Sequence, residues 1–297
     1  SKMRNIFIDE LILAAKKNKK IILIVNDLGY SFVEKFAKMF PKQFYNAGVA
    51  EQNMAGVAAG MALEGCHVFV YSIGNFSTFR CAEQIRNDID YHNLPVTLVN
   101  VGAGLRYGNL GYTHHSLQDY SLMRSFPNML INSPNNLTET KSCMRYILKN
   151  PQPSYLRLTQ VKDHFIEKKT PNLKPGKWMP IIETKGSNKT FLTTGGLVTL
   201  EKKLLINKQF NNFSIFSLPM WGMKHKERQI KQIKKWDTVF VLEDHLEDGG
   251  FGSWLKESIN NTNVKTKIIS KSISKKVIGK AGSEKYLLEK YFLKFFE

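Results

Sequence analysis

The chain of 297 residues is long enough for two α/β domains, each with its own hydrophobic core. Its 42% hydrophobic and 23% charged residues are typical of a packed globular protein, which excludes wholesale disorder and fibrous designs. The formal net charge of +18 suggests anionic partners, but the densest lysine clusters are not interleaved with aromatic residues. We therefore expect a solvated basic surface and no nucleic acid partner.

The N-terminal residues and the cysteines bear on cellular location. No apolar run approaches the roughly 20 residues that span a bilayer, and SKMRNIFIDE at the start lacks the apolar stretch of a signal peptide. Cys66, Cys81 and Cys143 show no CxxC spacing, which favours a reducing compartment and disfavours a metal site. We predict a cytoplasmic protein with no membrane partner and no metal-ligating residue of its own.

Short apolar runs in chain order predict the organisation. They lie at 19–27, 66–72, 94–102, 128–134 and 153–159, and again at 190–196, 213–219, 237–245 and 265–271. Such runs, separated by segments long enough for helices, are typical of buried parallel strands. The Pro-, Gly- and Lys-rich residues 166–187 are the expected linker. The fold class is therefore α/β, with two doubly wound domains at 1–165 and, smaller, at 188–297.

One carboxylate stands at the start of a helix that is otherwise small and apolar. In YNAGVAEQNMAGVAAGMALEG (45–65), Glu51 precedes apolar residues at spacings of three and four, which predicts a helix buried on most sides. An acid in the first turn gains roughly 0.3–1 kcal/mol from the helix dipole. The pattern alone leaves open whether Glu51 only stabilises the helix or takes part in chemistry.

This segment resembles the stretch of transketolases and of 1-deoxyxylulose-phosphate synthases that carries their invariant glutamate. The resemblance implies a thiamine diphosphate enzyme in which Glu51 binds the aminopyrimidine ring and promotes its imino tautomer, as a catalytic residue. It extends over nearly the whole chain and implies a transketolase-like pyrimidine-binding domain followed by the transketolase C-terminal domain. In the latter, EDHLEDGGFG (243–252) looks like the family's acidic strand end and glycine turn into a helix.

Two further segments of the first domain carry the resemblance. GNFSTF (74–79) looks like the transketolase pattern that lines the pyrimidine pocket, which implies cofactor contacts by Phe76 and Phe79. GYTHHS (111–116) resembles the family's Gly-x-Thr-His segment, which implies that His114 lies beside the substrate as a catalytic and substrate-binding residue. A neutral imidazole there can donate or accept a proton near pH 7.

The end of the first predicted strand, VNDLGYS (25–31), also matches the family. The match implies that Asp27 and Leu28 bind the cofactor and that Ser31 binds a sugar phosphate. Arg4 matches an upstream phosphate-binding arginine. Ordinary turn chemistry for the aspartate and a solvated surface position for the arginine remain alternatives.

Several family residues are missing. Gly102, Leu110 and Gln160 stand where transketolases have a substrate histidine, a hydroxyl-binding aspartate and a phosphate-binding arginine, which suggests an unusual substrate pair. The Gly-Asp-Gly motif that binds Mg²⁺ and diphosphate in the family does not occur in the chain. The resemblance thus implies a split enzyme. An N-terminal transketolase subunit would supply the diphosphate-binding domain and hold Mg²⁺, in an α2β2 heterotetramer.

The leading hypothesis is a C-terminal subunit of a transketolase-like transferase of carbohydrate metabolism. It would move a two-carbon ketol unit between a ketose and an aldehyde, and only together with its partner chain. The alternatives are the β subunit of a 2-oxo acid dehydrogenase decarboxylase component, and a deoxyxylulose-phosphate-synthase-like carboligase that releases CO2 from a 2-oxo acid. A basic scaffold without activity is the non-enzymatic alternative.

Overall fold

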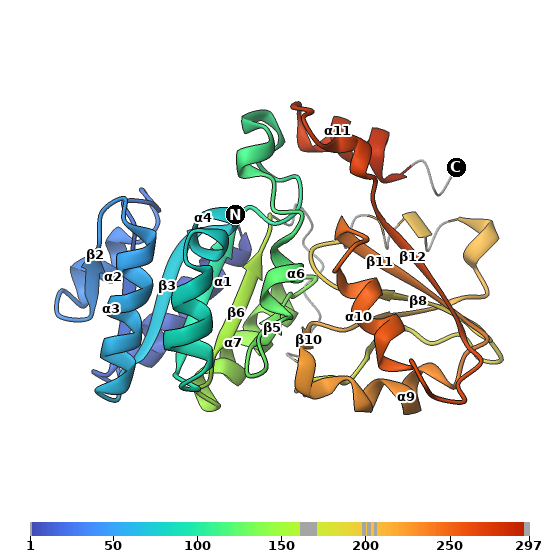
Figure 1. Cartoon of the computed structure of the whole chain (residues 1–297), viewed down its shortest axis with the longest axis horizontal. Coiled ribbons are helices and arrows are strands. Elements are labelled where there is room, and N and C mark those ends of the chain that lie inside the picture. Colours follow the sequence, from blue (N-terminus) through green and yellow to red (C-terminus); the bar gives the residue numbers. More distant parts are fainter. Residues whose placement is uncertain (1, 161–170, 198–199, 201–202, 205–206, 294–297) are drawn as a thin grey trace.

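The computed structural model describes residues 2–160, 171–197, 200, 203–204 and 207–293. Two β-sheets lie side by side along the long axis of the molecule, and helices cover them (Figure 1). The predicted fold class, α/β with two mainly parallel sheets, is confirmed. Within the described ranges, no helix is both long and apolar enough to cross a membrane.

The first sheet has seven strands in the order β10-β5-β6-β4-β3-β1-β2. The strands are β1 (Ile21–Val25), β2 (Phe44–Asn46), β3 (His67–Ile73), β4 (Val96–Val101), β5 (Leu130–Asn132), β6 (Ser154–Leu158) and β10 (Met220–Trp221). All neighbours pair in parallel except β10, which runs antiparallel to β5. The apolar runs predicted β1 and β3 to β6, whereas β2 and β10 lie outside these runs.

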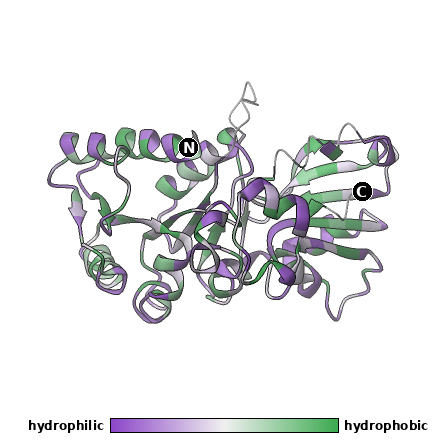
Figure 2. Cartoon of the chain, turned by 90° about the horizontal axis from the view of Figure 1, so that it is seen from above, coloured by the Kyte–Doolittle hydropathy of each residue, from purple (hydrophilic) through white to green (hydrophobic). Residues whose placement is uncertain are grey.

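Helices cover both faces of this sheet. They are α1 (Lys2–Ala15), α2 (Glu34–Met39), α3 (Glu51–Leu63), α4 (Gly74–Phe79), α5 (Ala82–Gln84), the π-helix η1 (Ile85–Asp90), the 3-10 helices η2 (Gly108–Leu110) and η3 (Tyr112–His114), α6 (Asp119–Met123) and α7 (Leu137–Lys149). Helices α1 and α7 share one core with the odd residues of β1, and α3 and η1 share the other with its even residues. Figure 2 shows these helices on either side of the strands.

The second sheet has five strands in the order β12-β11-β8-β9-β7. Its strands are β7 (Met179–Ile182), β8 (Lys189–Thr193), β9 (Ser214–Ser217), β11 (Thr238–Leu246) and β12 (Lys267–Ile273). The helices with it are η4 (Lys208–Phe210), η5 (Met223–His225), α9 (Glu227–Ile233), α10 (Phe251–Ser258), η6 (Lys275–Val277) and α11 (Glu284–Tyr291). Only the β7 edge is antiparallel among these pairs.

Two strands do not follow the predicted domain division. Strand β7 begins inside 166–187 and joins the second sheet, while β10 leaves the second half of the chain and joins the first sheet. Residues 161–170, which include the predicted boundary at 165, lie outside the described residues. The division into 1–165, a linker and 188–297 stays a prediction.

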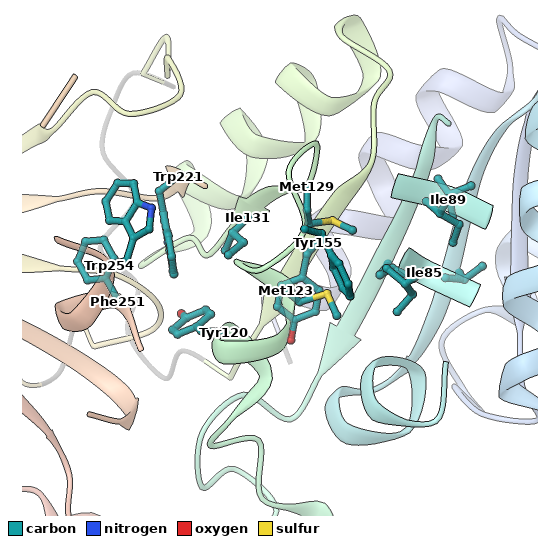
Figure 3. Packing of buried hydrophobic residues seen from close by; sticks show 14 of the residues in the cluster. Ile85, Ile89, Tyr120, Met123, Met129, Ile131, Tyr155, Trp221, Phe251 and Trp254 are labelled. Carbon is teal, nitrogen blue, oxygen red and sulfur yellow. The ribbon is translucent and has the colours of Figure 1, made fainter. Parts of the chain in front are cut away.

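Aromatic side chains fill the contact between the two halves (Figure 3). Trp221 of β10 lies 5.1 Å from Tyr120 of α6 and 5.0 Å from Phe251 of α10, between ring centroids. Trp254 lies 5.1 Å from Trp221. All four side chains are buried. Burial of this much aromatic surface fixes the orientation of the second sheet against the first.

Candidate active site

Glu51 is a buried carboxylate at the first residue of α3. Its exposed fraction is 6%, and Oε1 accepts hydrogen bonds from Asn26 Nδ2 and Arg80 Nη1, both at 2.9 Å. Asn26 follows β1 directly and Arg80 follows α4, so the ends of two neighbouring parallel strands bring both donors to one edge of the sheet. The carboxylate therefore lies at the carboxyl edge, where open α/β sheets bind ligands.

The helix that carries Glu51 differs from its prediction. Ala55, Ala58 and Ala59 pack against the sheet, but Val57 is 39% exposed, and no atom lies within 4 Å of a Cβ placed at Gly60. The prediction that α3 is buried on most sides is therefore wrong for this chain alone. One face packs on the sheet and a second face of small and apolar residues is exposed.

A cavity of about 470 Å³ lies beside Arg80, the ion-pair partner of the Glu51 carboxylate. The lining residues are Asn75, Phe76, Phe79, Arg80, Tyr112, Thr113 and Gln118. Phe76 and Phe79, both predicted as cofactor contacts, thus share one wall, and Phe79 is 47% exposed. Arg80 connects this wall to Glu51, because its Cζ lies 4.0 Å from the centroid of the Phe76 ring.

His114 lies against this wall. Its ring centroid is 5.1 Å from that of Phe76 in an edge-on arrangement, and its Nδ1 is 2.9 Å from Thr113 Oγ1. The neighbouring His115 is fully buried, its Nε2 lies 3.3 Å from Gly108 O, and burial lowers its pKa. Arg80 thus links Glu51 to Phe76, and Phe76 contacts His114. The predicted roles of these three residues stay predictions.

The segment that carries His114 is held by the second half of the chain. Gly282 N donates to Gly108 O at 3.1 Å, and Arg106 Nη1 lies 2.8 Å from Glu284 Oε2 at the start of α11. In Figure 1, α11 (red) accordingly lies at the top of the molecule, next to the green segment that contains η2 and η3. The second half of the chain therefore helps to position the site.

The structure places Asp27 and Leu28 in the turn after β1. Asp27 is exposed and has a φ of 58°, a left-handed conformation that few non-glycine residues adopt. Its amide donates to Asn46 Oδ1 at 2.9 Å, and Tyr30 Oη donates to its carboxylate at 3.1 Å. Asp27 thus has structural partners, and Asn26, not Asp27, contacts Glu51.

Arg4 and Ser31 lie near each other but on the other side of this edge. The Arg4 guanidinium lies 4.6 Å from the centroid of Phe32, the residue after Ser31. Ser31 has a φ of 61°, and its amide donates to Glu34 Oε1 at 2.6 Å. The structure does not bring either residue into contact with Glu51 or His114.

Gly102 stands where the family has a histidine, and the ring of Tyr107 lies against it. It has a φ of 87°, and a Cβ there would overlap the ring of Tyr107. Tyr107 in turn lies edge-on to His114, at 6.4 Å between centroids. The ring of Tyr107 therefore fills the space that a side chain at Gly102 would take.

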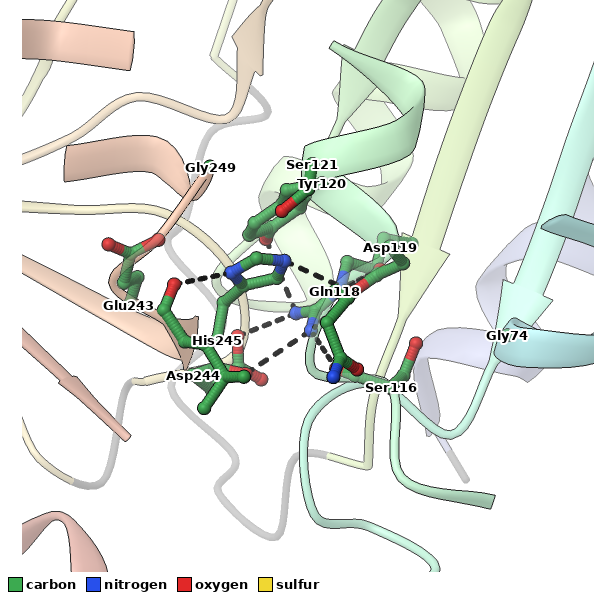
Figure 4. Close-up of polar contacts among 12 residues, drawn as sticks. Gly74, Ser116, Gln118, Asp119, Tyr120, Ser121, Glu243, Asp244, His245 and Gly249 are labelled. Atoms are coloured by element: carbon green, nitrogen blue, oxygen red, sulfur yellow. Dashed lines mark hydrogen bonds and ion pairs between the residues drawn. The ribbon is translucent and has the colours of Figure 1, made fainter. Parts of the chain in front are cut away.

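A second buried polar cluster joins the two halves of the chain (Figure 4). Arg157 of β6 donates from Nε to Asp119 Oδ2 and from Nη1 to Asp244 Oδ1, both at 2.6 Å. Burial raises the pKa of Asp244 to about 6, although Arg157 opposes this shift. Glu243 accepts from the amides of Phe251 and Gly252, and burial raises its pKa to about 8. At the acidic strand end, Asp244 thus joins the two halves of the chain and Glu243 binds the first turn of α10.

The sequence prediction missed Asn26, Arg80 and Tyr107. A polar residue directly after an apolar strand was the available signal for Asn26. Arg80 is the only charged residue in GNFSTFRCA, directly after the second phenylalanine, which was a signal of the same kind. Nothing in the sequence indicated Tyr107, because its contact with His114 depends on the turn at Gly102.

A doubly wound domain with a buried glutamate and an aromatic cavity at its carboxyl edge is the arrangement of a pyrimidine-binding domain. The family model described as "Transketolase, pyrimidine binding domain" matches residues 1–162. The chain therefore belongs to the transketolase family, whose enzymes use thiamine diphosphate.

Three relatives make the comparison more specific. A protein of Methanocaldococcus jannaschii named as a transketolase C-terminal section is 33% identical over 98% of this chain and 92% of its own length. A subunit of an apulose-4-phosphate transketolase from Phocaeicola vulgatus is 29% identical over 90% of this chain and 86% of its own. A solved structure titled "Split gene transketolase, inactive beta4 tetramer" has a TM-score of 0.81 and 26% identity, and the match covers 97% of this chain and 92% of that one. The resemblance to the C-terminal subunit of a split transketolase is confirmed.

The residues present fit the aminopyrimidine part of this cofactor. Glu51 supplies a buried carboxylate, and Asn26 Oδ1 is a buried acceptor without a hydrogen-bond partner among the described residues. Phe76 and Phe79 supply aromatic surface next to the carboxylate. A planar heterocycle with ring nitrogens and an amino group can satisfy both kinds of contact.

Proposed function

We propose that this chain is the C-terminal subunit of a transketolase that transfers a two-carbon ketol unit from a ketose to an aldehyde. The observation that supports this most is the carboxylate of Glu51, buried at the start of α3 and next to an aromatic cavity. A stabilising acid alone would lie on the surface of the helix end, where it would keep its hydration.

Each of the site residues takes a stated role in this proposal. Bound thiamine diphosphate supplies the nucleophilic carbon that breaks and forms the carbon–carbon bond. Glu51 exchanges a proton with a pyrimidine nitrogen, and Asn26 holds the carboxylate in place by its hydrogen bond of 2.9 Å. Phe76 and Phe79 contact the ring through their aromatic surfaces. His114 donates a proton to, or accepts one from, a substrate oxygen.

The remaining predicted contacts lie farther out. Asp27 and Leu28, in the turn next to Asn26, bind the cofactor in this proposal. Arg4 and Ser31 bind the phosphate of a sugar substrate, and Arg4 would have to leave its contact with Phe32. In this proposal, Arg4 and Ser31 therefore select a phosphorylated sugar over an unphosphorylated one.

A partner chain belongs to the same proposal. The exposed face of α3 presents Val57 and Leu63, and Val49 is 76% exposed in the turn before it. An apolar surface of this kind, beside a site, is typical of a protein interface. We propose that an N-terminal subunit covers it, contributes the diphosphate-binding domain and Mg²⁺, and forms an α2β2 heterotetramer with two copies of this chain. The three cysteines carry no disulfide, which supports a cytoplasmic location.

The test is reconstitution with the partner and an assay of ketol transfer with Glu51→Gln. Glu64→Gln is the matched control, since Glu64 follows the other end of the same helix. We expect Glu51→Gln to lower turnover by about 10²–10⁴-fold, the usual contribution of a proton-transfer residue, and Glu64→Gln to leave it unchanged. Wild-type turnover in Glu51→Gln would refute the role. Release of CO2 from a 2-oxo acid would identify a synthase-type carboligase instead.

A further inference from the structure

Arg80 occupies the polar edge of the proposed pyrimidine site. Its Nη1 donates to Glu51 Oε1 at 2.9 Å, and its Cζ lies 4.0 Å from the centroid of the Phe76 ring. A guanidinium is planar, carries N–H donors at its edge and stacks on aromatic faces. One planar group therefore contacts both the carboxylate and the aromatic wall of the site.

The proposed ligand needs the same two contacts. A pyrimidine nitrogen must reach the Glu51 carboxylate, and the ring must lie against the phenylalanine wall. Asn26 and Arg80 both donate to Oε1, and no described residue donates to Oε2. Because Arg80 lines the cavity and Glu51 does not, a ring that approaches Oε1 from the cavity meets the guanidinium first.

Of the two donors to Glu51, Arg80 is the one that can leave. Its side chain is 49% exposed, whereas Asn26 is 2% exposed. A half-exposed arginine exchanges its ion pair for hydration at low cost. Movement of Asn26 would require opening of the core below the end of β1.

We propose that Arg80 is a built-in competitor of the cofactor, which occupies the place of the aminopyrimidine ring until the ring arrives. This inference rests on the proposed function, because it takes Glu51 as the ligand of the ring. In the chain without cofactor the guanidinium neutralises a buried carboxylate that would otherwise be unpaired. On binding, the ring takes over the contact with Glu51 and Arg80 turns into the solvent.

The sign of the change in ring affinity on mutation of Arg80 distinguishes a competitor from a binding residue. Loss of an arginine that holds the cofactor would weaken binding, whereas loss of a competitor tightens it. The displaced contacts are one half-exposed ion pair and one cation–π contact, which together correspond to about tenfold in affinity. Arg80→Gln removes both contacts and keeps a polar side chain.

The experiment titrates 4-amino-2-methylpyrimidine, the ring alone, into this chain and follows its proton signals by saturation-transfer NMR. We expect the Kd of Arg80→Gln to be about tenfold lower than that of the wild type. The control is Arg86→Gln, which removes the same charge from η1, where Arg86 donates to Asn87 Oδ1, and its Kd should stay within about twofold. Equal or weaker binding of the ring by Arg80→Gln would overturn the inference.

A second measurement follows the guanidinium itself. The Arg80 ¹⁵N signals of the isolated chain should shift when the ring is added and when Glu51 is changed to Gln, and signals that move in neither case would overturn the inference. Thiamine diphosphate with Mg²⁺ is then added to a mixture with the partner chain. If the mixture binds the cofactor but Arg80→Gln does not tighten ring binding, only this inference fails. If neither the mixture nor any variant binds, the proposed function fails with it.

Discussion

Arg157 holds the two halves of the chain together, and its removal should be costly. The guanidinium is 1% exposed and bonds Asp119 and Asp244, whose carboxylates come from opposite sides of the contact. Arg157→Met leaves two buried carboxylates without their cation. Breaking a buried ion pair in this way costs about 3–5 kcal/mol, which is a large part of a typical stability of about 5–15 kcal/mol.

The assay is urea denaturation at pH 7, followed by far-UV circular dichroism and by the fluorescence of the tryptophans at the contact. The control is Lys256→Met, because Lys256 pairs with Glu247 and both side chains are exposed, where such a pair is worth about 0–1 kcal/mol. Adding Asp119→Asn and Asp244→Asn to Arg157→Met should recover most of the loss. A loss below about 1 kcal/mol in Arg157→Met, equal to that of the control, would refute the reasoning.

Three further changes test other parts of the structure. Gly102→Ala should lower the free energy of unfolding by about 1–3 kcal/mol, because of its positive φ and the Tyr107 ring; Tyr107→Ala should recover part of this, and an unchanged urea midpoint would contradict it. Glu243 has a raised pKa of about 8 in the folded state, so its stabilisation is complete below the unfolded pKa and is lost as pH rises through 8. The free energy of unfolding should fall by about 1–2 kcal/mol between pH 6.5 and 8, and a slope that persists in Glu243→Gln would assign it to another group. His114→Asn should lower kcat by about 10²-fold or more while cofactor affinity stays within about twofold; equal losses in both would make His114 a structural residue.

Apolar runs made most of the sheet predictable. The runs at 19–27 and 94–102 contain strands β1 and β4, and the run at 66–72 covers all but the last residue of β3, because strands buried on both faces consist almost wholly of apolar residues. Strand β10 has two residues, and its partner β5 lies about ninety positions earlier in the chain. A pairing of this kind depends on packing of the two halves, which no local pattern records.

The site divides in the same way. Glu51, Phe76 and His114 were predictable because they lie within segments that resemble a known family. Arg80 and Asn26 carried only a local polar signal, which does not reveal the one hydrogen bond that each makes to Glu51 across 29 and 25 positions of the chain. Arg157 was hidden within an apolar run, and its partners lie 38 and 87 positions away. A basic residue within a predicted buried strand thus indicates an acidic partner elsewhere in the chain, but it does not indicate which acidic residue this is.

The central claim is that this chain supplies the pyrimidine half of a thiamine diphosphate site shared with a second chain. The most direct measurement is calorimetric titration of thiamine diphosphate with Mg²⁺ into this chain alone and into an equimolar mixture with an N-terminal transketolase section encoded beside it. We predict tight binding in the mixture only, and its loss in Glu51→Ala. Equally tight binding by this chain alone, or no binding in either sample, would contradict the claim.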